Sequence, residues 1–349
     1  MHPYHEGAAA PFLMCARYRG ELGLPGPMTL WWLLRVKCLV TGASGFIGAE
    51  LCRQLQARGD DVVATSRSGS PLPDGTATVV LDLSASDVDS TLLVGVDTVF
   101  HLAGIAHTRA QAAQYERVNF QATVALAAAA RSAGVRCFIF LSTVKAMGPA
   151  GSADVRAESD VTPPQDAYGL SKWHAECALR DAGQNSAMAV LILRPALVYG
   201  AQAKGNLALL AKAARRGLPR PPAGGARSMI ARADLVSLLL LLPGLELSGV
   251  HTWIATDGQQ YTTRRVYDAL RSAQGVGPTS AWLPSWCWRG AAALYDLWRG
   301  DRGDSTCLKL FGDERYSNGA LIAATGWQPS QTLESALHSA SAMPLEVDE

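Results

Sequence analysis

A tyrosine and a lysine four residues apart are the first side chains in this sequence that could do acid–base chemistry. They belong to the segment YGLSK (168–172), inside a stretch at 167–182 whose pattern predicts a helix, so both lie on one helix face. A phenol with a pKa of about 10 is a weak acid at neutral pH, and a neighbouring cation lowers that pKa. The spacing favours Tyr168 as a proton donor or acceptor and Lys172 as its activator. Two ordinary surface residues are the alternative.

Two hydroxyl groups could complete this catalytic group. The apolar run at 137–143 (CFIFLST) ends in Ser142 and Thr143. A parallel strand would place them at the carboxyl edge of a sheet, where ligands bind in α/β proteins. Lysine is also scarce in the chain. Both contexts favour the catalytic interpretation of the tyrosine–lysine pair.

A glycine-rich loop is the second chemical feature. The segment TGASGFIG (41–48) follows an apolar run at 36–42 and opens a predicted helix at 46–58. Gly42 suits a tight turn, Gly45 a close approach of the backbone to a pyrophosphate, and Gly48 the packing of helix on strand. Backbone N–H groups where the helix starts, at Phe46 and Ile47, would bind the phosphates. We predict a dinucleotide site, and a purely structural turn is the alternative.

The end of the second predicted strand, at 61–66, bears on which dinucleotide binds. An NAD site has an acidic residue there that holds the ribose 2′-hydroxyl, but Arg67 and Ser68 follow this strand and no carboxylate is present. Arginine suits a 2′-phosphate, so NADP(H) is favoured, with NAD(H) or a merely solvated Arg67 as alternatives. Asp82 and Leu83 end the third strand, where a carboxylate can reach the adenine amino group; a turn is the alternative role for Asp82.

These residues require a fold that gathers strand ends. Short apolar runs between helical patterns indicate parallel strands buried on both faces. We therefore predict an α/β fold: a Rossmann-type doubly wound parallel sheet with a smaller mixed α/β substrate lobe at the C-terminal side. The expected strands lie at 36–42, 61–66, 78–83, 96–104, 137–143 and 189–195, with helices at 46–58, 110–133, 167–182, 204–216, 262–274 and 286–299.

Composition excludes several other classes. With 31 basic and 30 acidic residues and 48% hydrophobic residues, the chain matches neither a disordered protein nor a nucleic-acid binder. Seven scattered cysteines without CxxC spacing indicate reduced thiols in a cytoplasmic protein and no metal site. The apolar runs at 29–34 and 235–242 are far shorter than the roughly 20 residues of a spanning helix, so no integral membrane segment is expected.

Taken together, the motifs resemble the extended short-chain dehydrogenase/reductase superfamily, and within it the nucleotide-sugar epimerase/dehydratase family. The resemblance covers roughly 36–340 and is carried by TGASGFIG (41–48), HLAG (101–104), Asn119, LST (141–143), YGLSK (168–172), RPALVYG (194–200) and GWQP (326–329). It implies that Tyr168 transfers the proton, that Lys172 holds the nicotinamide ribose and lowers the tyrosine pKa, and that Thr143 rather than Ser142 binds the substrate oxygen. It also implies cofactor contacts for Ala103, Gly104 and Pro195, with Asn119 bracing the active-site strand.

The resemblance also suggests a substrate. In similar enzymes, residues at the positions of Asn206 and Arg227 contact the diphosphate of a UDP-sugar; a helix cap and a surface ion pair are the alternatives. The segments at 142–148, 158–176 and 204–210 are similar to bacterial surface-polysaccharide enzymes. We expect a reductase that uses NADPH to reduce the C4 ketone of a UDP-4-keto-6-deoxy-N-acetylhexosamine. The alternatives are a UDP-sugar 4-epimerase with bound NAD, a reductase of an apolar ketone, and a non-enzymatic NADP sensor or structural subunit.

The expected domain organisation follows from these assignments. Residues 1–35 are expected to be a loose N-terminal extension, of which 1–27 could arise from an upstream start codon. Residues 36–195 form the Rossmann domain, with later contributions near 233–260, and 196–349 form mainly the substrate lobe. The tryptophan-rich segment at 283–298 is expected to be a lid or core of that lobe, with docking on a membrane or a partner as the alternative. A homodimer is common in similar proteins.

Overall fold

The computed structural model describes residues 35–85, 88–106, 110–150, 154–184, 186–200, 206–277, 283–299 and 311–341. The chain divides into two compact units, Met1–Arg35 and Val36–Glu349. The predicted N-terminal extension lies outside the described residues except for Arg35, and so do Lys204 and Gly205. A helix begins at Asn206, but the side chain of this residue is outside the description.

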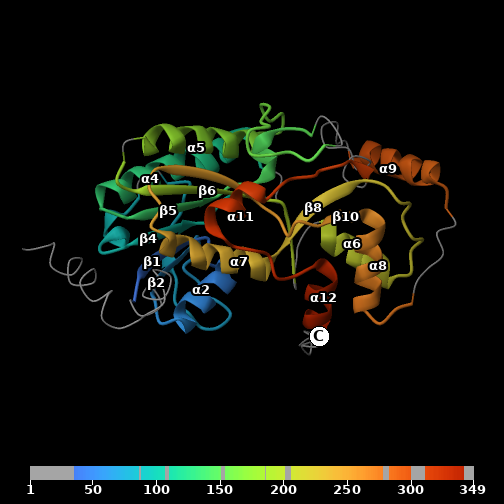
Figure 1. Cartoon of the computed structure of the whole chain (residues 1–349), viewed down its shortest axis with the longest axis horizontal. Coiled ribbons are helices and arrows are strands. Elements are labelled where there is room, and N and C mark those ends of the chain that lie inside the picture. The colour runs from blue at the N-terminus through green and yellow to red at the C-terminus, as the bar shows by residue number, and fades with distance from the viewer. Residues whose placement is uncertain are drawn as a thin grey trace, which may run out of the picture. The chain divides into compact units, whose positions relative to one another are not determined.

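One large sheet organises the second unit (Figure 1). Its seven strands follow the order β3-β2-β1-β4-β5-β6-β9, and every neighbouring pair is parallel. The chain winds outward from β1 in both directions, so the predicted doubly wound sheet is confirmed. The strands are β1 (Lys37–Thr41), β2 (Asp61–Ser66), β3 (Val79–Val80), β4 (Thr98–His101), β5 (Cys137–Leu141), β6 (Ala189–Pro195) and β9 (Val250–Ala255).

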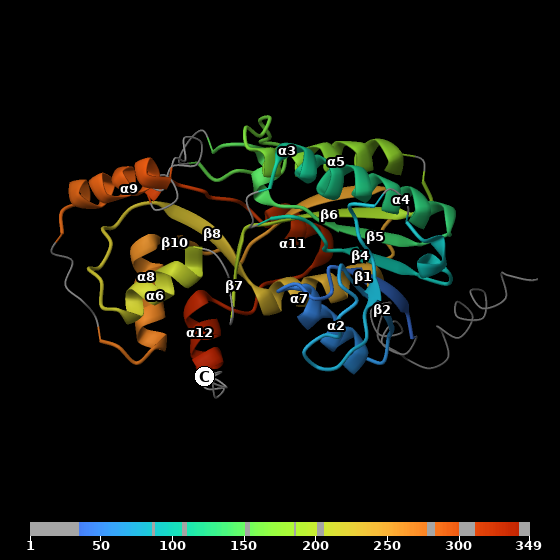
Figure 2. The ribbon, with the colours of Figure 1, turned by 180° about the vertical axis from the view of Figure 1, so that it is seen from behind.

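Helices cover both faces of this sheet. Figures 1 and 2 show α4 (Ala122–Ser132) and α5 (Ala167–Gly183) on one face, and α2 (Gly48–Ala57) and α7 (Arg232–Leu241) on the other. Strands β5 and β6 are buried along their whole length, because side chains on both faces pack against helices. This explains why they read as continuous apolar runs in the sequence.

The predicted helix at 110–133 is three pieces, because a π-helical turn interrupts it. Helix α3 (Ala112–Tyr115) runs into η5 (Glu116–Gln121), which is π-helical, and then into α4. Such turns insert one extra residue and often occur at functional sites. Here the buried Asn119 lies in the turn, and its side chain bonds both the N–H and the C=O of Ile105, at 2.8 and 3.0 Å.

The third predicted strand is much shorter than expected. Strand β3 covers Val79–Val80 rather than 78–83, because the chain turns at Asp82, whose carboxylate accepts hydrogen bonds from the backbone N–H and the hydroxyl of Ser84. Strand β9, in contrast, lies in the large sheet beside β6, so the 250–255 segment contributes to the nucleotide-binding half of the fold although it follows much of the smaller lobe in sequence.

The smaller lobe is built on a three-stranded mixed sheet. Its strands β7 (Leu197–Tyr199), β8 (Ala226–Ala231) and β10 (Gln260–Thr262) lie in the order β10-β8-β7. Three helices pack against it: α6 (Asn206–Arg215), α8 (Thr263–Ala273) and α12 (Leu333–Ser341). The two sheets are linked in sequence because β7 follows β6 directly and Asp257 follows β9.

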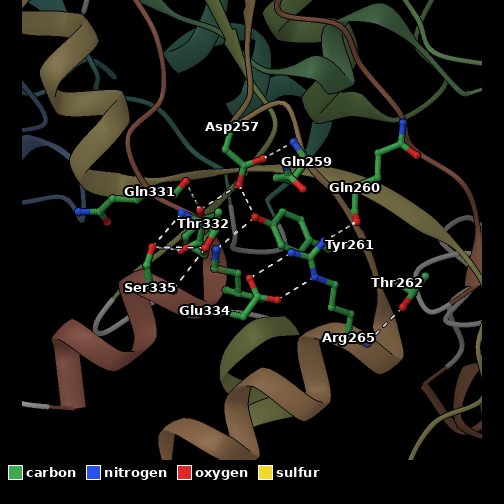
Figure 3. A network of polar contacts seen from close by, with 12 residues as sticks. Asp257, Gln259, Gln260, Tyr261, Thr262, Arg265, Gln331, Thr332, Glu334 and Ser335 are labelled. Atoms are coloured by element: carbon green, nitrogen blue, oxygen red, sulfur yellow. Dashed lines mark hydrogen bonds and ion pairs between the residues drawn. The ribbon is translucent and has the colours of Figure 1, made fainter.

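A buried polar network fastens this lobe at Asp257 (Figure 3). The carboxylate accepts hydrogen bonds from the hydroxyls of Tyr199 and Tyr261, at 2.9 and 2.7 Å. Burial raises the pKa of Asp257, whereas the bonds from the tyrosines lower it. Arg265 lies over the Tyr261 ring at 4.4 Å and pairs with Glu334 of α12 at 2.7 Å. The network ties β10, α8 and α12 together.

The tryptophan-rich segment is largely exposed and does not fill the core of the smaller lobe. It forms α9 (Ser285–Arg299), and its large side chains face solvent: Trp286 is 72% exposed, Leu297 79% and Trp298 83%. Ala292 is the one buried residue among the described side chains of this helix, so the core part of the expectation is not met, and the lid role stays a prediction.

Candidate active site

The glycine loop has the geometry of a close backbone turn. Gly42 has φ +71°, and a Cβ there would lie 2.8 Å from the backbone of Ala103. A Cβ on Gly45 would lie 3.0 Å from the Gly42 carbonyl oxygen, and one on Gly48 only 2.2 Å from it. A side chain at Gly42 or Gly48 would therefore require the backbone to move, and one at Gly45 would be crowded. The loop exposes Ser44 and Gly45 where α2 begins, which fits a pyrophosphate on the helix N-terminus.

Adding one methyl group at Gly48 should damage the loop. We expect Gly48→Ala to lower the free energy of unfolding by about 3 kcal/mol and to weaken dinucleotide binding, because the Cβ would displace the Gly42 carbonyl. Gly277→Ala is the matched control, since a Cβ there would meet nothing within 4 Å. Chemical unfolding of both variants measures the effect, and equal stabilities would contradict the close packing described for Gly48.

Thr143 and Tyr168 meet at the carboxyl end of β5. Tyr168 lies in the first turn of α5, and its phenol is hydrogen-bonded to the side chain of Thr143. Ser142 points elsewhere: it donates to the Glu176 carboxylate at 2.5 Å, inside a buried pair of Glu176 with Arg194. Of the two predicted hydroxyls, Thr143 is therefore the one beside the tyrosine.

Lys172 lies below this pair rather than on the phenol. Its ammonium group is buried, donates to the Leu141 carbonyl at 2.9 Å and lies 4.5 Å from the centre of the Phe140 ring. Burial lowers the pKa of Lys172 to about 8. Burial also raises the pKa of Tyr168 to about 12, which the Thr143 hydrogen bond opposes. The lowering of the tyrosine pKa by Lys172 stays a prediction: the Thr143 hydrogen bond is the contact that lowers this pKa here, and the Lys172 ammonium donates to the Leu141 carbonyl.

Removing the buried ammonium should change how stability depends on pH. The pKa of Lys172 falls from 10.5 in the unfolded chain to about 8 in the fold, so the unfolded chain binds more protons between these values and wild-type stability rises through that window. Lys172→Met lacks this gain. Its free energy of unfolding relative to wild type should therefore fall by about 3 kcal/mol between pH 7 and 10.5. Urea unfolding at both pH values tests this, with the exposed Lys212→Met as control; a difference independent of pH would contradict the burial of a charged ammonium.

A hydrogen-bond chain fixes the backbone between the glycine loop and the catalytic pair. Thr123 donates to the Asn119 carbonyl, so its hydroxyl accepts from Nε2–H of His101 at 2.8 Å. Nδ1 of His101 then accepts from Thr41 at 2.7 Å, and Thr41 accepts from the N–H of Ala103 at 3.2 Å. Burial, with a smaller contribution from Lys172, lowers the pKa of His101 to about 3, so the ring stays neutral.

The other predicted cofactor residues line the same region. A Cβ on Gly104 would lie 3.0 Å from Oδ1 of Asn119 and 3.3 Å from Nζ of Lys172, which leaves room there only for a glycine. Asn119 also donates to Ser171 at 3.1 Å. Pro195 ends β6 and is buried. The structure thus gathers the expected backbone and side-chain positions around the ends of β1, β4, β5 and β6.

The predicted adenosine side shows one cavity of about 560 Å³. Asp82 and Leu83 line it, together with Arg117 and Gln121. Arg67 is exposed just beyond β2, and its charge contributes to lowering the pKa of Asp82, although the bonds from Ser84 lower it more. The hydroxyl of Ser66, at the end of β2, is hydrogen-bonded to that of Thr78 at 2.8 Å.

Arg227 is one of the two residues predicted to contact the substrate diphosphate. It lies in β8, and its Nη2 is buried without a hydrogen-bond partner among the described residues. Its charge lowers the pKa of the neighbouring Tyr316, although burial raises that pKa to about 12 overall. A buried donor left without a partner costs free energy, so a ligand that accepts from Arg227 would be stabilised.

Two residues that connect this arginine to the catalytic loop were not predicted. Arg156 donates to the carbonyls of Met147 and Gly148, at 2.6 and 2.9 Å, just after Thr143. Its guanidinium lies 5.9 Å from the centre of the Tyr316 ring, and Tyr316 is the neighbour of Arg227. Neither residue belongs to a periodic pattern in the sequence, because both lie on irregular segments that meet only in the fold.

The described part of the chain has neither a metal-binding cluster nor a membrane-spanning helix, and three of its cysteines are buried. Across the described ranges, no group of three or more histidine, cysteine or acidic side chains is arranged to hold a metal ion. No described helix has the length and apolar character needed to cross a bilayer. Cys38, Cys52 and Cys137 are buried, and burial raises the pKa of each to about 12, which makes them poor nucleophiles.

Fold and site define an α/β enzyme of the extended short-chain dehydrogenase type, with a dinucleotide loop and a tyrosine–threonine pair over one sheet edge. Residues 38–242 match the model of the NAD dependent epimerase/dehydratase family. The chain belongs to this family, and its cofactor is a nicotinamide nucleotide.

Known proteins resemble the chain over most of its length. A UDP-glucose 4-epimerase of Vibrio cholerae is 30% identical over 85% of this chain and 92% of its own length. A 2-alkyl-3-oxoalkanoate reductase of Stenotrophomonas maltophilia is 28% identical over 69% of this chain and 76% of its own. Among solved structures, MoeE5 in complex with UDP-glucose and NAD superposes with a TM-score of 0.70 at 25% identity, covering 88% of this chain and 97% of that one.

Proposed function

We propose that the protein reduces the C4 ketone of a UDP-4-keto-6-deoxy-N-acetylhexosamine in surface-polysaccharide synthesis. Arg227 supports the nucleotide-sugar part, because its buried Nη2 has no partner within the described chain and guanidinium groups bind diphosphates by charge-assisted hydrogen bonds. MoeE5 was solved with UDP-glucose, and the Vibrio cholerae relative is a UDP-glucose 4-epimerase. Asn206 is proposed as a second diphosphate contact at the start of α6.

The observation that carries the reductive direction is the end of β2, which has no carboxylate and is followed by the exposed Arg67. This favours NADPH, which a reduction consumes, over the NAD that an epimerase holds through its cycle. The phenol of Tyr168 is protonated at neutral pH, as tyrosines ordinarily are, so it can supply a proton. Thr143, hydrogen-bonded to this phenol, would bind the ketone oxygen, and Tyr168 would protonate that oxygen as charge develops. A bound reduced nicotinamide supplies the hydride.

The chain's own residues would hold that cofactor at several points. The N–H groups of Phe46 and Ile47 would bind its pyrophosphate, with Gly42, Gly45 and Gly48 giving the space for the close approach. Lys172, beneath the tyrosine, would bind the nicotinamide ribose. Asn119, through Ile105, keeps the neighbouring backbone in place, and Ala103, Gly104 and Pro195 would border the nicotinamide half.

NADP(H) is the proposed form of the cofactor. Arg67 is exposed directly after β2, and Arg117 lines the cavity that Asp82 and Leu83 border, so two cations are available near the expected adenosine. No carboxylate ends β2 to bind a ribose 2′-hydroxyl.

A UDP-sugar 4-epimerase with tightly held NAD is the second candidate function, and the Vibrio cholerae relative favours it. Such an enzyme takes hydride and proton from C4 and then returns both, so it must hold NAD through the whole cycle; the lack of a carboxylate at the end of β2 argues against that. Denaturing the purified protein and identifying the released nucleotide separates the two functions. We expect an empty site that binds NADPH in preference to NADH; stoichiometric bound NAD would support the epimerase instead.

A further inference from the structure

An arginine from the second half of the chain contacts the glycine loop. Arg232 is the first residue of α7, and its guanidinium carbon lies 4.7 Å from the centre of the Phe46 ring. Gly200 lies beside this pair: a Cβ there would meet Cβ of Arg232 at 3.3 Å and the tip of Phe46 at 3.4 Å. The absence of a side chain at position 200 therefore lets arginine and loop approach each other.

Arg232 forms no ion pair with a carboxylate among the described residues. Within the described residues its guanidinium forms no hydrogen bond or ion pair, and its ring contact with Phe46 is the interaction observed. Glu50, one turn into α2, is held by Arg53 and Gln54. The pKa of Glu50 is lowered mainly by Arg53 and slightly by the charge of Arg232, which places Arg232 close to the start of α2.

The loop beneath this arginine has no charged side chain of its own. Residues 41–48 are TGASGFIG, so their contribution to anion binding comes from backbone N–H groups and the helix dipole, which is equivalent to roughly half an elementary charge. A dinucleotide pyrophosphate carries about two negative charges, which a half charge does not neutralise. The guanidinium of Arg232 lies over the Phe46 ring, which orients it. The backbone N–H of Phe46 is itself one of the proposed phosphate-binding groups.

We propose that Arg232 is a cofactor-binding residue whose guanidinium pairs with the pyrophosphate of the dinucleotide held by the glycine loop. This inference rests on the dinucleotide site of the proposed function and adds a contact from outside the nucleotide-binding motif. It also links α7, which follows the Arg227 strand in sequence, to the occupied glycine loop. Arg232 would thus bind the cofactor diphosphate, and Arg227 would bind the substrate diphosphate.

The test measures binding of two diphosphates by calorimetry, without turnover. ADP-ribose carries the cofactor's pyrophosphate without nicotinamide, and UDP carries the substrate's. In Arg232→Leu, the Kd for ADP-ribose should rise about 10- to 100-fold, the range for losing a charge-assisted hydrogen bond, and the Kd for UDP should not change. Arg232→Lys keeps the charge and should lose less affinity. The gap between wild type and Arg232→Leu should narrow in high salt, which screens the charge.

Arg131→Leu, at the exposed end of α4, removes the same charge away from the loop and should leave both Kd values unchanged. An unchanged ADP-ribose Kd in Arg232→Leu would overturn the inference, and so would a loss of UDP affinity as large as that for ADP-ribose. Thermal unfolding of the ligand-free variants checks that the fold is kept. If the wild-type chain bound no ADP-ribose at all, the proposed function itself would fail, which is a separate outcome.

Discussion

Tyr168→Phe should lower kcat by about 10³- to 10⁴-fold, at the upper end of what a positioned acid contributes, while dinucleotide affinity stays at the wild-type level. The variant removes one hydroxyl from a side chain that is half buried and hydrogen-bonded to Thr143. The ring and its packing stay, so the loss reports the missing proton. Single-turnover kinetics with a 4-keto UDP-sugar and NADPH, beside fluorescence titration of NADPH, measure both quantities.

Tyr115 provides the matched control for this substitution. Its ring centre lies 6.0 Å from that of Tyr168, and it is buried in α3. We expect Tyr115→Phe to keep kcat within a few-fold of wild type. Near-normal turnover in Tyr168→Phe, or an equal loss in Tyr115→Phe, would show that the phenol of Tyr168 is not the proton donor.

Arg227→Leu is expected to have the second largest effect, on substrate binding. A guanidinium that makes two charge-assisted bonds to a diphosphate contributes about 1.5–3 kcal/mol for each bond, so losing both should raise the Kd for UDP by roughly 10²-fold or more. The kcat at saturating substrate should change much less. Arg227 is suited to this role because its Nη2 is already buried and unpaired in the described structure, so binding a phosphate desolvates little more of it.

Calorimetry with UDP and with ADP-ribose tests this prediction. Arg220→Leu is the control, because Arg220 lies on the same lobe but is paired with Asp268. UDP affinity should survive in Arg220→Leu and fall in Arg227→Leu, with ADP-ribose affinity unchanged in both. A Kd for UDP unaffected by Arg227→Leu would contradict a nucleotide-sugar substrate held by β8 and would favour the apolar-ketone alternative.

The fold could be predicted where the local sequence pattern reflects how deeply a segment is buried or how closely it is packed. Strands β5 and β6 are apolar, apart from Arg194, because helices cover both of their faces, and the glycines of the loop occupy positions where a Cβ would crowd the backbone. The π-helical turn at Glu116–Gln121 was not predictable. Its Asn119 pairs with the backbone of Ile105, a contact that forms only when the chain is folded.

The electrostatics of the site depended on burial, which sequence does not show. The spacing of Tyr168 and Lys172 correctly indicated one helix face, yet the pKa of the tyrosine rises instead of falling because desolvation dominates. Arg156 and Tyr316 lie 160 residues apart in sequence and pair as an isolated β-bridge. No local pattern in either segment could predict such a long-range contact.

The central claim is that the chain reduces a 4-keto UDP-sugar, and isotope transfer tests it most directly. The purified protein would be incubated with UDP-4-keto-6-deoxy-N-acetylhexosamine and NADPH carrying deuterium at C4 of the nicotinamide. We expect stoichiometric oxidation of NADPH and deuterium at C4 of the product sugar. No consumption of added NADPH and no label in the sugar would contradict the reductase; interconversion of UDP-glucose and its C4 epimer in a parallel incubation without NADPH would identify the chain as an epimerase.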